Sequence, residues 1–534
     1  MKYPSIFNDV LGPVMRGPSS SHCAAALRIG RIARDLMNER ISAVLIEFDP
    51  NGSLATTHYS QGSDMGLLGG LLGWEAHDER LPNYESEIRK AGIDVQIVIT
   101  DIGATHPNTY QLTLYHEGER KTLTALSTGG GMIEVIEIDG ATVSIQGDYH
   151  ETLIYVQQPD GVLPWLMTQA VLDSVEWCEG NKPFILVKSR KPLEAGLLET
   201  LWSMEEVRDI CQIRPVLPVL SSKQMGVPFI TCEEMLAFNV DKSLQLWELA
   251  LEYESKRGNI AQEEVWQKME ALVEIMQASI RQGIKGTEYP DRILGCQSGQ
   301  FRQRMRSHQL VEGEVLNTII LYVSAMMEVK SSMGVIVAAP TAGACAGLPG
   351  ACLGTADARG LSKEEKIKGM LAAGMIGVFI AAHATFAAEV GGCQAECGSG
   401  SGMAAAAIVT LAGGTLHQAL AAASIALQNS FGMVCDPVAN RVEAPCLGKN
   451  IMAASNALSC ANIALADYDP LIPLDEVIHA MKQVGESISH ELRCTGLGGL
   501  AATPTSQKIA ARLQKNAQQL PLGSFPQDFR FKSC

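Results

Sequence analysis

Two long runs of small apolar residues, at residues 370–388 and 403–427, dominate the second half of the sequence. Each run approaches the length of a helix that spans a membrane. Charged or polar side chains flank and interrupt the first run. Lys368 precedes its apolar part, His383 lies within it, and Glu389 follows. We therefore expect both runs to be buried helices of a large helical domain, with no membrane partner.

Apolar periodicity predicts more helices around these two runs. The predicted helices of the second half cover residues 244–255, 262–282, 314–330, 363–387, 403–428 and 474–489. Gly, Pro, Cys and Asn gather in the breaks between them, as chemical groups on loops would. We expect an all-helical domain over residues 226–515, followed by a tail over 516–534 in which residues 520–534 look loop-like.

Residues 1–148 alternate between helical and strand patterns, which predicts an α/β domain. The expected helices cover 24–38 and 65–74, and the expected strands cover 43–49, 95–101 and 110–115. Together with the helical domain, this pattern predicts a multidomain α+β protein.

A third segment, residues 149–225, has a pattern of its own. Its expected strands cover 152–157, 183–188 and 213–220, and its expected helices cover 161–175 and 205–210. This order is compatible with a small ferredoxin-like regulatory module.

Charge and cysteine content narrow the class of protein. The formal charge of −16 argues against a nucleic-acid partner, because phosphate binding needs clustered Lys and Arg. The first residues do not form a cationic, apolar leader, so we expect a cytoplasmic protein. In such a chain, 14 cysteines do not indicate a disulfide framework, although a few could bind metal.

Cys393, Cys435 and Cys446 lie in loop-like settings at the ends of predicted helices. Thiolates there can converge without breaking a helix, and soft thiolates suit iron–sulfur clusters, zinc or copper(I). Their spacing matches neither zinc ribbons nor bacterial ferredoxins, so a purely structural role stays open at this point. The other cysteines in glycine-rich or loop contexts are Cys296, Cys345, Cys397 and Cys534.

Several ordered motifs carry a resemblance to a known family. The first domain contains GPVMRGPSSSH (12–22), NGS (51–53), HPNT (106–109) and GGG (129–131). The helical domain contains AAPTAG (338–343), GCQAE (392–396), CDPV (435–438) and PC (445–446). Together these motifs closely resemble the iron–sulfur-dependent L-serine dehydratases over most of residues 1–150 and 228–510.

The resemblance implies a beta-chain-like first domain, an ACT-like module over 149–225 and an alpha-chain catalytic domain. It implies that Cys393, Cys435 and Cys446 hold a [4Fe–4S] cluster, without pyridoxal phosphate. It also implies that Cys534 ligates the fourth iron in the resting state. The expected reaction converts the small-molecule amino acid L-serine, with L-threonine as an alternative, into a ketoacid and ammonia. We also expect a homodimer.

The remaining site residues are candidates by chemistry and position. For substrate binding they are Ser19, Ser20, Ser21, Thr341, Gly343 and Asn429. The alternatives are a helix N-cap at Ser21 and a tight turn at 340–343. Lys449 could pair with a carboxylate or with the cluster charge, and a solvated surface Lys is the alternative.

The candidates for the catalytic base are His22, His106 and His383, because imidazole titrates near neutral pH. His383 lies in an apolar helix, where a histidine is more often a core residue. His106 precedes Pro107, which favours extended or turn backbone.

Three departures from the family pattern bear on the substrate. Residues 60–64 read Ser-Gln-Gly-Ser-Asp where relatives commonly have Gly-His-Gly-Thr-Asp, so the amide of Gln61 replaces a titratable group. Cys23 replaces a usual Thr, and Cys397 replaces a small apolar residue. The alternatives are therefore a cluster-dependent lyase for another β-substituted acid, such as a cysteine desulfidase, a ligand-sensing homologue without catalysis, and a zinc protein.

Overall fold

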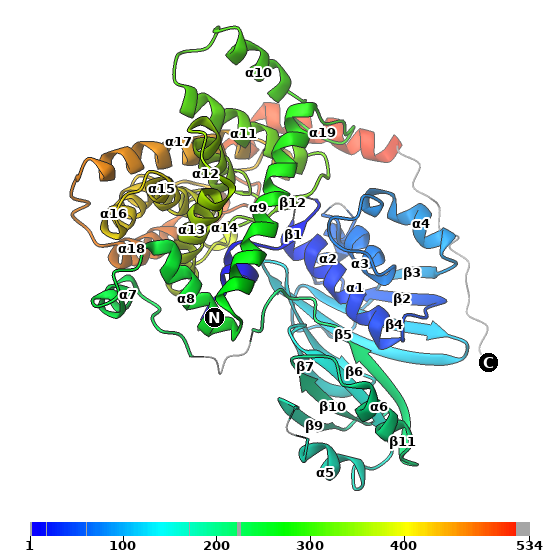
Figure 1. The fold of residues 1–534 in the computed structure, drawn as a ribbon. Coiled ribbons are helices and arrows are strands. Elements are labelled where there is room, and N and C mark those ends of the chain that lie inside the picture. The colour runs from blue at the N-terminus through cyan, green and yellow to red at the C-terminus, as the bar shows by residue number, and fades with distance from the viewer. Residues whose placement is uncertain (1–2, 18, 60, 170, 222–225, 520–534) are drawn as a thin grey trace.

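The computed structural model describes residues 3–17, 19–59, 61–169, 171–221 and 226–519. Figure 1 shows three parts: an α/β domain, a small module below it, and a large helical body beside both. The chain is thus multidomain with mixed helix and sheet, as the sequence predicts.

The first domain is one mixed sheet covered by helices. Its strand order is β3-β2-β4-β5-β6-β7, with β2 and β3 parallel and the other neighbours antiparallel. The strands are β2 (Ala43–Phe48), β3 (Asp94–Ile99), β4 (Thr109–His116), β5 (Glu119–Gly129), β6 (Met132–Ile138) and β7 (Ala141–Ile145). The helices are α1 (Ala25–Leu36), α2 (Leu54–Thr57), α3 (Ser63–Leu71) and α4 (Tyr84–Lys90).

The predicted strands β2, β3 and β4 and helices α1 and α3 are confirmed to within a few residues, whereas β5 to β7 were not predicted. Helices α1 and α3 approach very closely through glycines. A Cβ on Gly30 would lie 2.2 Å from the carbonyl oxygen of Leu67, and one on Gly66 would lie 2.1 Å from that of Cys23. Only glycine therefore fits at these two crossings.

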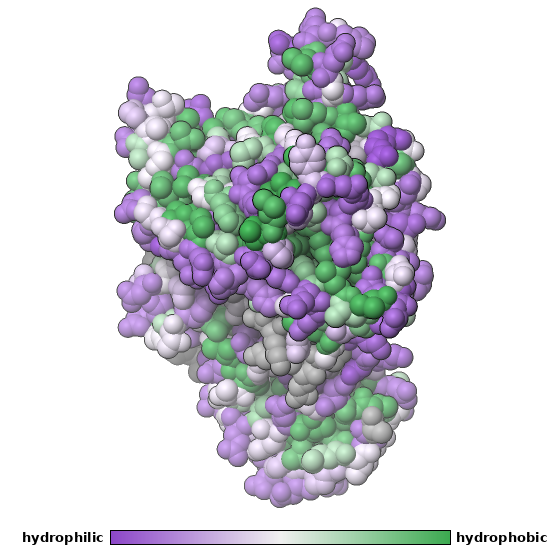
Figure 2. Space-filling view, turned by 90° about the vertical axis from the view of Figure 1, so that its left-hand side faces the viewer, coloured by the Kyte–Doolittle hydropathy of each residue, from purple (hydrophilic) through white to green (hydrophobic). Residues whose placement is uncertain are grey.

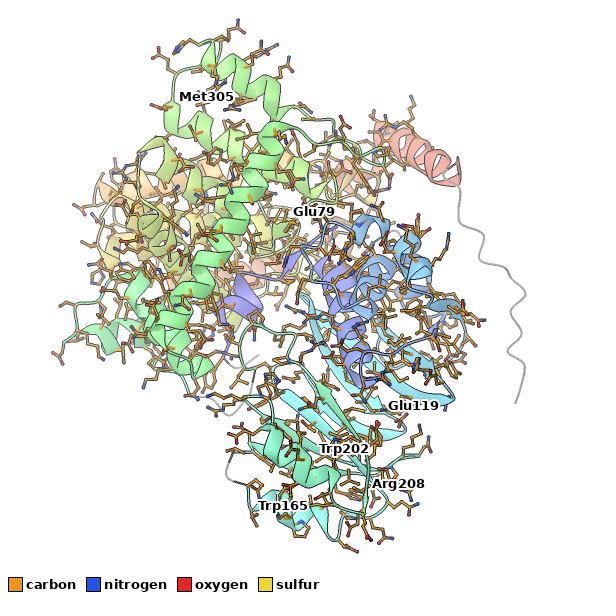
Figure 3. All side chains as sticks on the ribbon, turned by 45° about the vertical axis from the view of Figure 1, so that its right-hand side comes forward. Glu79, Glu119, Trp165, Trp202, Arg208 and Met305 are labelled. Carbon is orange, nitrogen blue, oxygen red and sulfur yellow. The ribbon has the colours of Figure 1, made fainter. Side chains whose placement is uncertain are left out.

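The middle module has the chain order strand–helix–strand–strand–helix–strand. Its elements are β8 (His150–Val156), α5 (Val162–Met167), β9 (Ser174–Cys178), β10 (Phe184–Ser189), α6 (Ala195–Trp202) and β11 (Val207–Ile213). The sheet is antiparallel with the order β11-β8-β10-β9, which is the ferredoxin-like arrangement. Figure 3 shows Trp165 and Trp202 on α5 and α6 and Arg208 on β11.

Two expected helices of this module are wrong, and so is the expected strand over 213–220, because the strand β11 ends at Ile213. The expected helix over 205–210 is largely strand β11, whose residues pair with β8 from Val207 onward. The expected helix over 161–175 ends at Met167, and β9 follows it. In both places short polar–apolar alternation fits either period, and pairing with a neighbouring strand decided the outcome.

The module packs one sheet face on the first domain. Leu153, Leu186 and Cys211 of the module share a hydrophobic core with first-domain residues such as Ile133 and Ile145. The opposite face packs on α5 and α6 in a core of its own.

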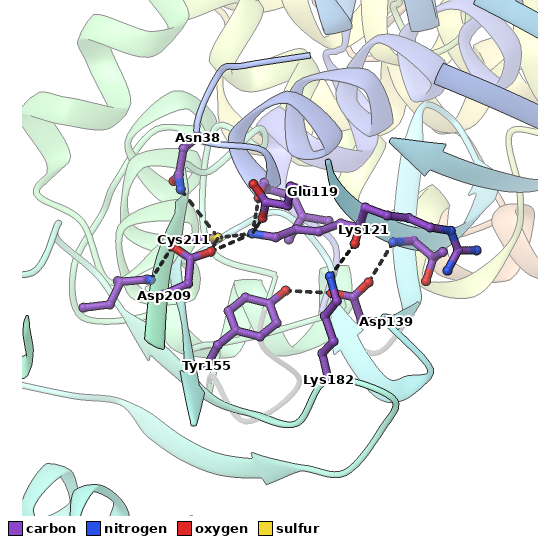
Figure 4. Close-up of polar contacts among 12 residues, drawn as sticks. Asn38, Glu119, Lys121, Asp139, Tyr155, Lys182, Asp209 and Cys211 are labelled. Carbon is purple, nitrogen blue, oxygen red and sulfur yellow. Dashed lines mark hydrogen bonds and ion pairs between the residues drawn. The ribbon is translucent and has the colours of Figure 1, made fainter. Parts of the chain in front are cut away.

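A buried polar network joins the two parts at one end of this interface (Figure 4). Lys121 of β5 donates to Asp209 Oδ2 over 2.9 Å and to Cys211 Sγ over 2.8 Å. Its ammonium also lies 4.8 Å from the centre of the Tyr155 ring. Burial lowers the pKa of Lys121, but these partners outweigh burial and raise it. The lysine therefore stays charged and ties the module to the first domain.

The helical body holds most of the remaining chain. Its main helices are α7 (Cys232–Asn239), α8 (Leu246–Gly258), α9 (Gln262–Lys285), α10 (Ser298–Arg306), α11 (Glu314–Lys330), α12 (Gly347–Ala358), α13 (Lys363–His383), α14 (Ala388–Gly391), α15 (Ser399–Leu411), α16 (Leu416–Gln428), α17 (Cys446–Leu465), α18 (Leu474–Ser487) and α19 (Pro504–Gln519). Helix α10 projects from the body near Met305 (Figures 1 and 3).

The first apolar run forms α13 and is buried, as predicted. Among the described residues this one helix is long and apolar enough to cross a membrane, and 72% of its apolar window is buried inside the protein. On the face drawn in Figure 2, hydrophilic residues interrupt the hydrophobic patches of the helical body.

The second apolar run is also buried, but it is two helices rather than one. Helix α15 ends at Leu411, and Gly413 has a φ of +76°, which glycine adopts without strain. Thr415 then caps α16 in a capping box with Gln418. A glycine pair and a capping residue within an apolar run were the signals for this break.

The N-terminal residues lie in the helical body rather than in the first domain. The π-helix η1 (Ile6–Val10) packs against α13, and a Cβ on Gly377 would lie 2.1 Å from Val10. Glu254 accepts hydrogen bonds from the hydroxyl of Ser5 and the amide of Ile6. Strand β1 (Val14–Met15) then pairs with β12 (Ile336–Val337), so the chain starts in one body and crosses to the other.

Candidate functional site

Cys393, Cys435 and Cys446 come from three separate breaks between helices. Cys393 precedes the π-helix η4 (Gln394–Gly398), Cys435 lies in the loop after α16, and Cys446 is the first residue of α17. Gly392 makes the turn before Cys393 with a φ of +69°, and a Cβ there would lie 2.8 Å from the carbonyl oxygen of Met433. All three thiols are buried.

These loops bring the thiols into one region. Cys393, Cys397 and Cys435 share a small buried cluster whose other members are alanines, with Cys494 packed against it. A hydrogen bond with Cys393 and burial together raise the pKa of Cys397. Burial raises the pKa of Cys446 to about 12, and the negative charge of Cys393 contributes to this shift. The three predicted ligands therefore lie in one neighbourhood, although they span more than fifty positions of the chain.

Asn450 holds two of the predicted site segments together. Its Nδ2 donates to the carbonyl oxygens of Gly343 and Cys446, each over 2.9 Å. Its Oδ1 accepts from the amide of Gly347 over 2.9 Å. The side chain is fully buried, so these bonds have no competition from water. Asn450 thereby fixes the 340–347 turn next to the first turn of α17.

Gln394 connects the turn that carries Cys393 to the loop that carries Cys435. Its Oε1 accepts from the backbone amide of Gly432 over 2.8 Å, and its backbone amide donates to the carbonyl oxygen of Met433 over 3.0 Å. The loop before Cys435 is thus anchored to the turn that carries Cys393.

Lys449 is paired rather than solvated. Its Nζ donates to Asp436 Oδ1 over 2.6 Å and to the carbonyl oxygen of Val434 over 2.5 Å. Burial lowers the pKa of Lys449, but Asp436 and the nearby Cys393 and Cys435 outweigh burial and raise it. The lysine is a fixed positive charge that holds the residues on both sides of Cys435.

Glu396 is a site residue that our sequence reasoning did not identify. Thr341 donates its hydroxyl hydrogen to Glu396 Oε1 over 2.7 Å. A Cβ on Gly343 would lie 3.1 Å from both carboxylate oxygens, so the turn at 341–343 lies directly against this carboxyl group. Burial raises the pKa of Glu396 to about 7, despite the opposing effect of Thr341. A group with this pKa can both accept and donate a proton at neutral pH.

The available signal for Glu396 was its position three residues after Cys393, in the GCQAE motif. Neither spacing nor composition separates it from the many exposed glutamates of the chain, whereas burial against Thr341 does.

The donor set fits a thiolate-bound cluster better than a single metal ion. Within the part of the chain that the structure describes, no three His, Cys, Asp or Glu side chains converge as one metal ion requires. A four-iron cluster separates its thiolate ligands more widely than one ion does, and buried soft thiols beside the cationic Lys449 suit it.

The predicted residues of the first domain form a second group. Ser19 Oγ lies 3.0 Å from His22 Nδ1, and His22 Nε2 lies 3.1 Å from Thr57 Oγ1. Since the Thr57 hydroxyl donates to the Ser53 carbonyl, the His22 Nε2 acts as the donor and its Nδ1 accepts from Ser19. Burial lowers the pKa of His22 to about 4, so its ring is neutral at pH 7.

The same network extends to His106. Ser53 donates its hydroxyl hydrogen to Asn108 Oδ1. The backbone amide of Asn108 donates to His106 Nδ1 over 3.1 Å. The structure therefore links Ser19, His22 and His106 through Thr57, Ser53 and Asn108. Ser53 and Asn108 belong to motifs of the resemblance but were not identified as site residues.

The loop that carries Gln61 contains a nearby histidine. His58 Nδ1 lies 2.8 Å from Asp64 Oδ1. Asp64, in the first turn of α3, thus has an imidazole partner just before the helix.

The two groups lie on either side of the boundary between the first domain and the helical body. Arg16 crosses it, donating to the carbonyl oxygens of Met333 and His77, near Glu79 in Figure 3. The short β1–β12 ribbon also joins the two bodies, and residues 19–22 follow β1 in the chain while residues 340–343 follow β12.

The other predicted residues have different surroundings. Asn429 ends α16 and donates to Asn456 Oδ1 and Cys460 Sγ, and these partners are not site thiols. His383 is exposed, and its Nε2 bonds to the carbonyl oxygen of Ile230. The side chains of Ser20 and Ser21 and all of Cys534 lie outside the described residues.

Comparison with known proteins covers both halves of the chain. The family described as serine dehydratase alpha chain matches residues 241–501. The probable L-serine dehydratase alpha chain of Bacillus subtilis is 36% identical over 285 residues, which is 53% of this chain and 95% of the relative. The probable beta chain of the same organism is 40% identical over 154 residues, or 29% of this chain and 69% of the relative.

A single-chain relative spans almost the whole length. The L-serine dehydratase of Streptomyces coelicolor is 26% identical over 496 residues, covering 91% of this chain and 96% of the relative. The helical match thus contains the three grouped cysteines, and the beta-chain match accounts for a second region of similarity.

Proposed function

This chain belongs to the L-serine dehydratase family, and we propose that it eliminates water from L-serine to give pyruvate and ammonia. The observation that carries the proposal is the grouping of Cys393, Cys435 and Cys446 beside the Glu396 carboxyl group. L-serine is the substrate named for the relatives, and the proposal extends it to this chain.

We propose that these three cysteines hold a [4Fe–4S] cluster. When bound, such a cluster supplies a Lewis-acidic iron that stabilises the negative charge of a departing hydroxide. Asn450 and Gln394 keep the three loops in register for it, and the Lys449 ammonium offsets part of the thiolate charge.

Glu396 is the proposed proton acceptor. Its Oε2 takes the α-proton of serine, while Thr341 holds Oε1 and sets the orientation of the carboxyl group. The Cβ–O bond then breaks, and the departing hydroxide takes the proton from Glu396 and leaves as water, which restores the carboxylate. The aminoacrylate leaves, tautomerises and is hydrolysed by a second water to pyruvate and ammonia. A pKa of about 7 suits this role because the carboxylate form is well populated at neutral pH.

Substrate anchoring is proposed for Ser19, Ser20 and Ser21, at the start of the π-helix η2 (Ser20–Ala24), and for the 341–343 turn. The Ser19 hydroxyl is held by His22 Nδ1, and the neutral His22 ring positions it without adding charge. His106 supports the same network through Asn108. His22 and His106 are therefore proposed as positioning residues.

The family assignment and the fold also support proposals about the protein as a whole. Residues 149–225 are proposed to be an ACT-like regulatory module, on the strength of the ferredoxin-like strand order. The protein is proposed to be a cytoplasmic homodimer without pyridoxal phosphate. We also propose domain divisions near residues 148 and 226, which the separate sheets β3–β7 and β8–β11 support, although residues 6–15 pack in the helical body.

One experiment tests the proposal as a whole. The full chain, purified without oxygen, is assayed for iron and inorganic sulfide and then given L-serine, L-threonine and L-cysteine. We expect a brown protein that releases pyruvate and ammonia from L-serine. A colourless protein with zinc in place of iron would refute the cluster, and sulfide release from L-cysteine as the main activity would identify the alternative lyase.

The proposed tail ligand needs a separate variant. Cys534→Ser should still assemble the cluster, as judged by iron and sulfide content, but should reach full activity without a lag. Loss of the cluster in this variant would contradict a resting-state role.

A further inference from the structure

Cys494 lies next to Cys435, and no role has been assigned to it so far. The segment that carries Cys494 runs beside the Cys435 loop as a short parallel bridge. Cys435 donates its amide hydrogen to the carbonyl oxygen of Leu492, and Cys494 donates its own to that of Cys435, each over 2.8 Å. The side chain of Cys494 also packs against the buried cluster that contains Cys435, and its thiol helps to raise the pKa of the Cys435 thiol.

Access to solvent differs between the two thiols of this pair. Cys494 is partly exposed, whereas Cys435 is 5% exposed. Leu497 and Leu500, which follow Cys494 closely, are also exposed, so this segment forms part of the protein surface. A small oxidant can therefore reach Cys494 before it reaches any other thiol of the group.

The second thiol pair of the site provides a contrast. Cys393 and Cys397 are also in contact, but both are 2% exposed and belong to one helical turn. Asn450 donates to Cys397 Sγ over 3.6 Å, which further encloses that pair. Of these two described pairs, the Cys435–Cys494 pair is the one with a partly exposed partner.

We propose that Cys435 and Cys494 form a disulfide whenever Cys435 is not held by the cluster. This inference rests on the proposed function only for the role of Cys435 as a ligand. The oxidant is a low-molecular-weight disulfide of the glutathione class.

The reaction takes place in two exchanges. The Cys494 thiolate attacks one sulfur of the oxidant, and the first small thiol leaves. The Cys435 thiolate then attacks the Cys494 sulfur, and the second small thiol leaves. The two protons from the protein thiols end on the two released thiols, so the protein loses two electrons and the oxidant gains them.

The disulfide protects Cys435 after loss of the cluster. A free Cys435 can oxidise to sulfinic acid, which is irreversible, whereas a disulfide is reduced back to thiols. The modification therefore keeps the empty site competent for reassembly, and it blocks assembly until the cell is reducing again.

Disulfide mapping of the full chain tests the proposal. Protein stripped of metal by a chelator is incubated with oxidised glutathione, alkylated, and digested for mass spectrometry. We expect most of Cys435 in a peptide linked to Cys494, with much less linkage between Cys393 and Cys397. Recovery of Cys494 only as free thiol or as its glutathione adduct would overturn the proposal.

Two variants serve as controls. Cys494→Ser should abolish the linkage, and after oxidation and reduction it should regain less iron and sulfide than the unaltered chain. Cys352→Ser, which changes a buried thiol outside the group, should behave as the unaltered chain does. Equal recovery of iron by Cys494→Ser and the unaltered chain would contradict the protective role.

The same samples separate this inference from the proposed function. Protein that retains iron and sulfide should resist the linkage, because Cys435 is then occupied. If iron-loaded protein links as fast as stripped protein, Cys435 is not a ligand and the cluster assignment fails, while the disulfide stands.

Discussion

The hydroxyl group of Thr341 donates to Glu396 Oε1 over 2.7 Å, joining a turn after β12 to the helical turn after Cys393. This contact places a buried carboxyl group with a pKa of about 7 beside the cysteine group. It is the relationship on which the proposed proton transfer depends.

Glu396→Gln keeps the acceptor for Thr341 but removes the ability to take a proton. We expect kcat to fall by about two to four orders of magnitude, as for the loss of a general base. The measurement is pyruvate release by variant protein whose iron and sulfide content equals that of the unaltered chain. A kcat within about threefold of the unaltered enzyme would show that another group accepts the proton.

Lys449→Met leaves the buried carboxylate of Asp436 without its cationic partner. The free energy of unfolding should fall by about 3 kcal/mol, the usual cost of breaking such a pair from one side. Chemical denaturation measures this loss. The double variant Lys449→Met/Asp436→Asn should recover part of it, whereas a further additive loss would show that the ion pair is not the cause.

The Ser19–His22 pair predicts coupled kinetic effects. Ser19→Ala and His22→Asn each remove the hydrogen bond between Ser19 Oγ and His22 Nδ1, so each should raise KM by about tenfold. Because both changes break one interaction, the double variant should show little further increase. Steady-state kinetics with L-serine measures all three, and additive increases would separate the roles of the two residues.

Glu151 should make the protein less stable as the pH rises. Its carboxyl group is fully buried, neither oxygen accepts a hydrogen bond, and Lys188 lies 3.8 Å away. Burial raises its pKa from 4.5 to about 8. The folded protein therefore keeps a proton that the unfolded chain releases, and the stabilisation present below pH 4.5 is lost as the pH rises toward 8.

Glu151→Gln removes this dependence while keeping the shape of the side chain. Relative to the unaltered chain, the variant should gain stability between pH 5 and 8 by up to roughly 1.4 kcal/mol per pH unit. Melting temperatures at the two ends of this range measure the effect. An equal difference at both pH values would mean that Glu151 titrates normally.

Several features of the fold could be predicted because they depend on local pattern. Helix α11 begins at Glu314 and ends at Lys330, as its periodicity predicts, and β2 follows the expected alternation. Strand β11 could not be predicted, because the alternation from Val207 to Ile213 gains its meaning only from pairing with β8. Likewise, Ile6 and Val10 look like the start of the first domain, and only their packing against α13 reveals otherwise.

The residues of the site also divide into those that the sequence predicts and those that only their spatial neighbours identify. Cys393, Cys435 and Cys446 were identified from motifs, since loop cysteines in an ordered family pattern are specific. Glu396 and Cys494 were not, because a glutamate and a cysteine acquire their roles from the groups that surround them in space. Asn450 is a further example, because its hydrogen bonds with Gly343 and Gly347 connect segments about a hundred residues apart.

By itself, the sequence determined the membership in a family, the helical nature of the second half and the three cysteines, because periodicity and motif are properties of neighbouring residues. Only the tertiary structure decided that Glu396 meets Thr341, that Cys494 meets Cys435, and that Lys449 is paired. The physical reason is that burial sets pKa values and hydrogen-bond partners, and burial depends on residues distant in the chain.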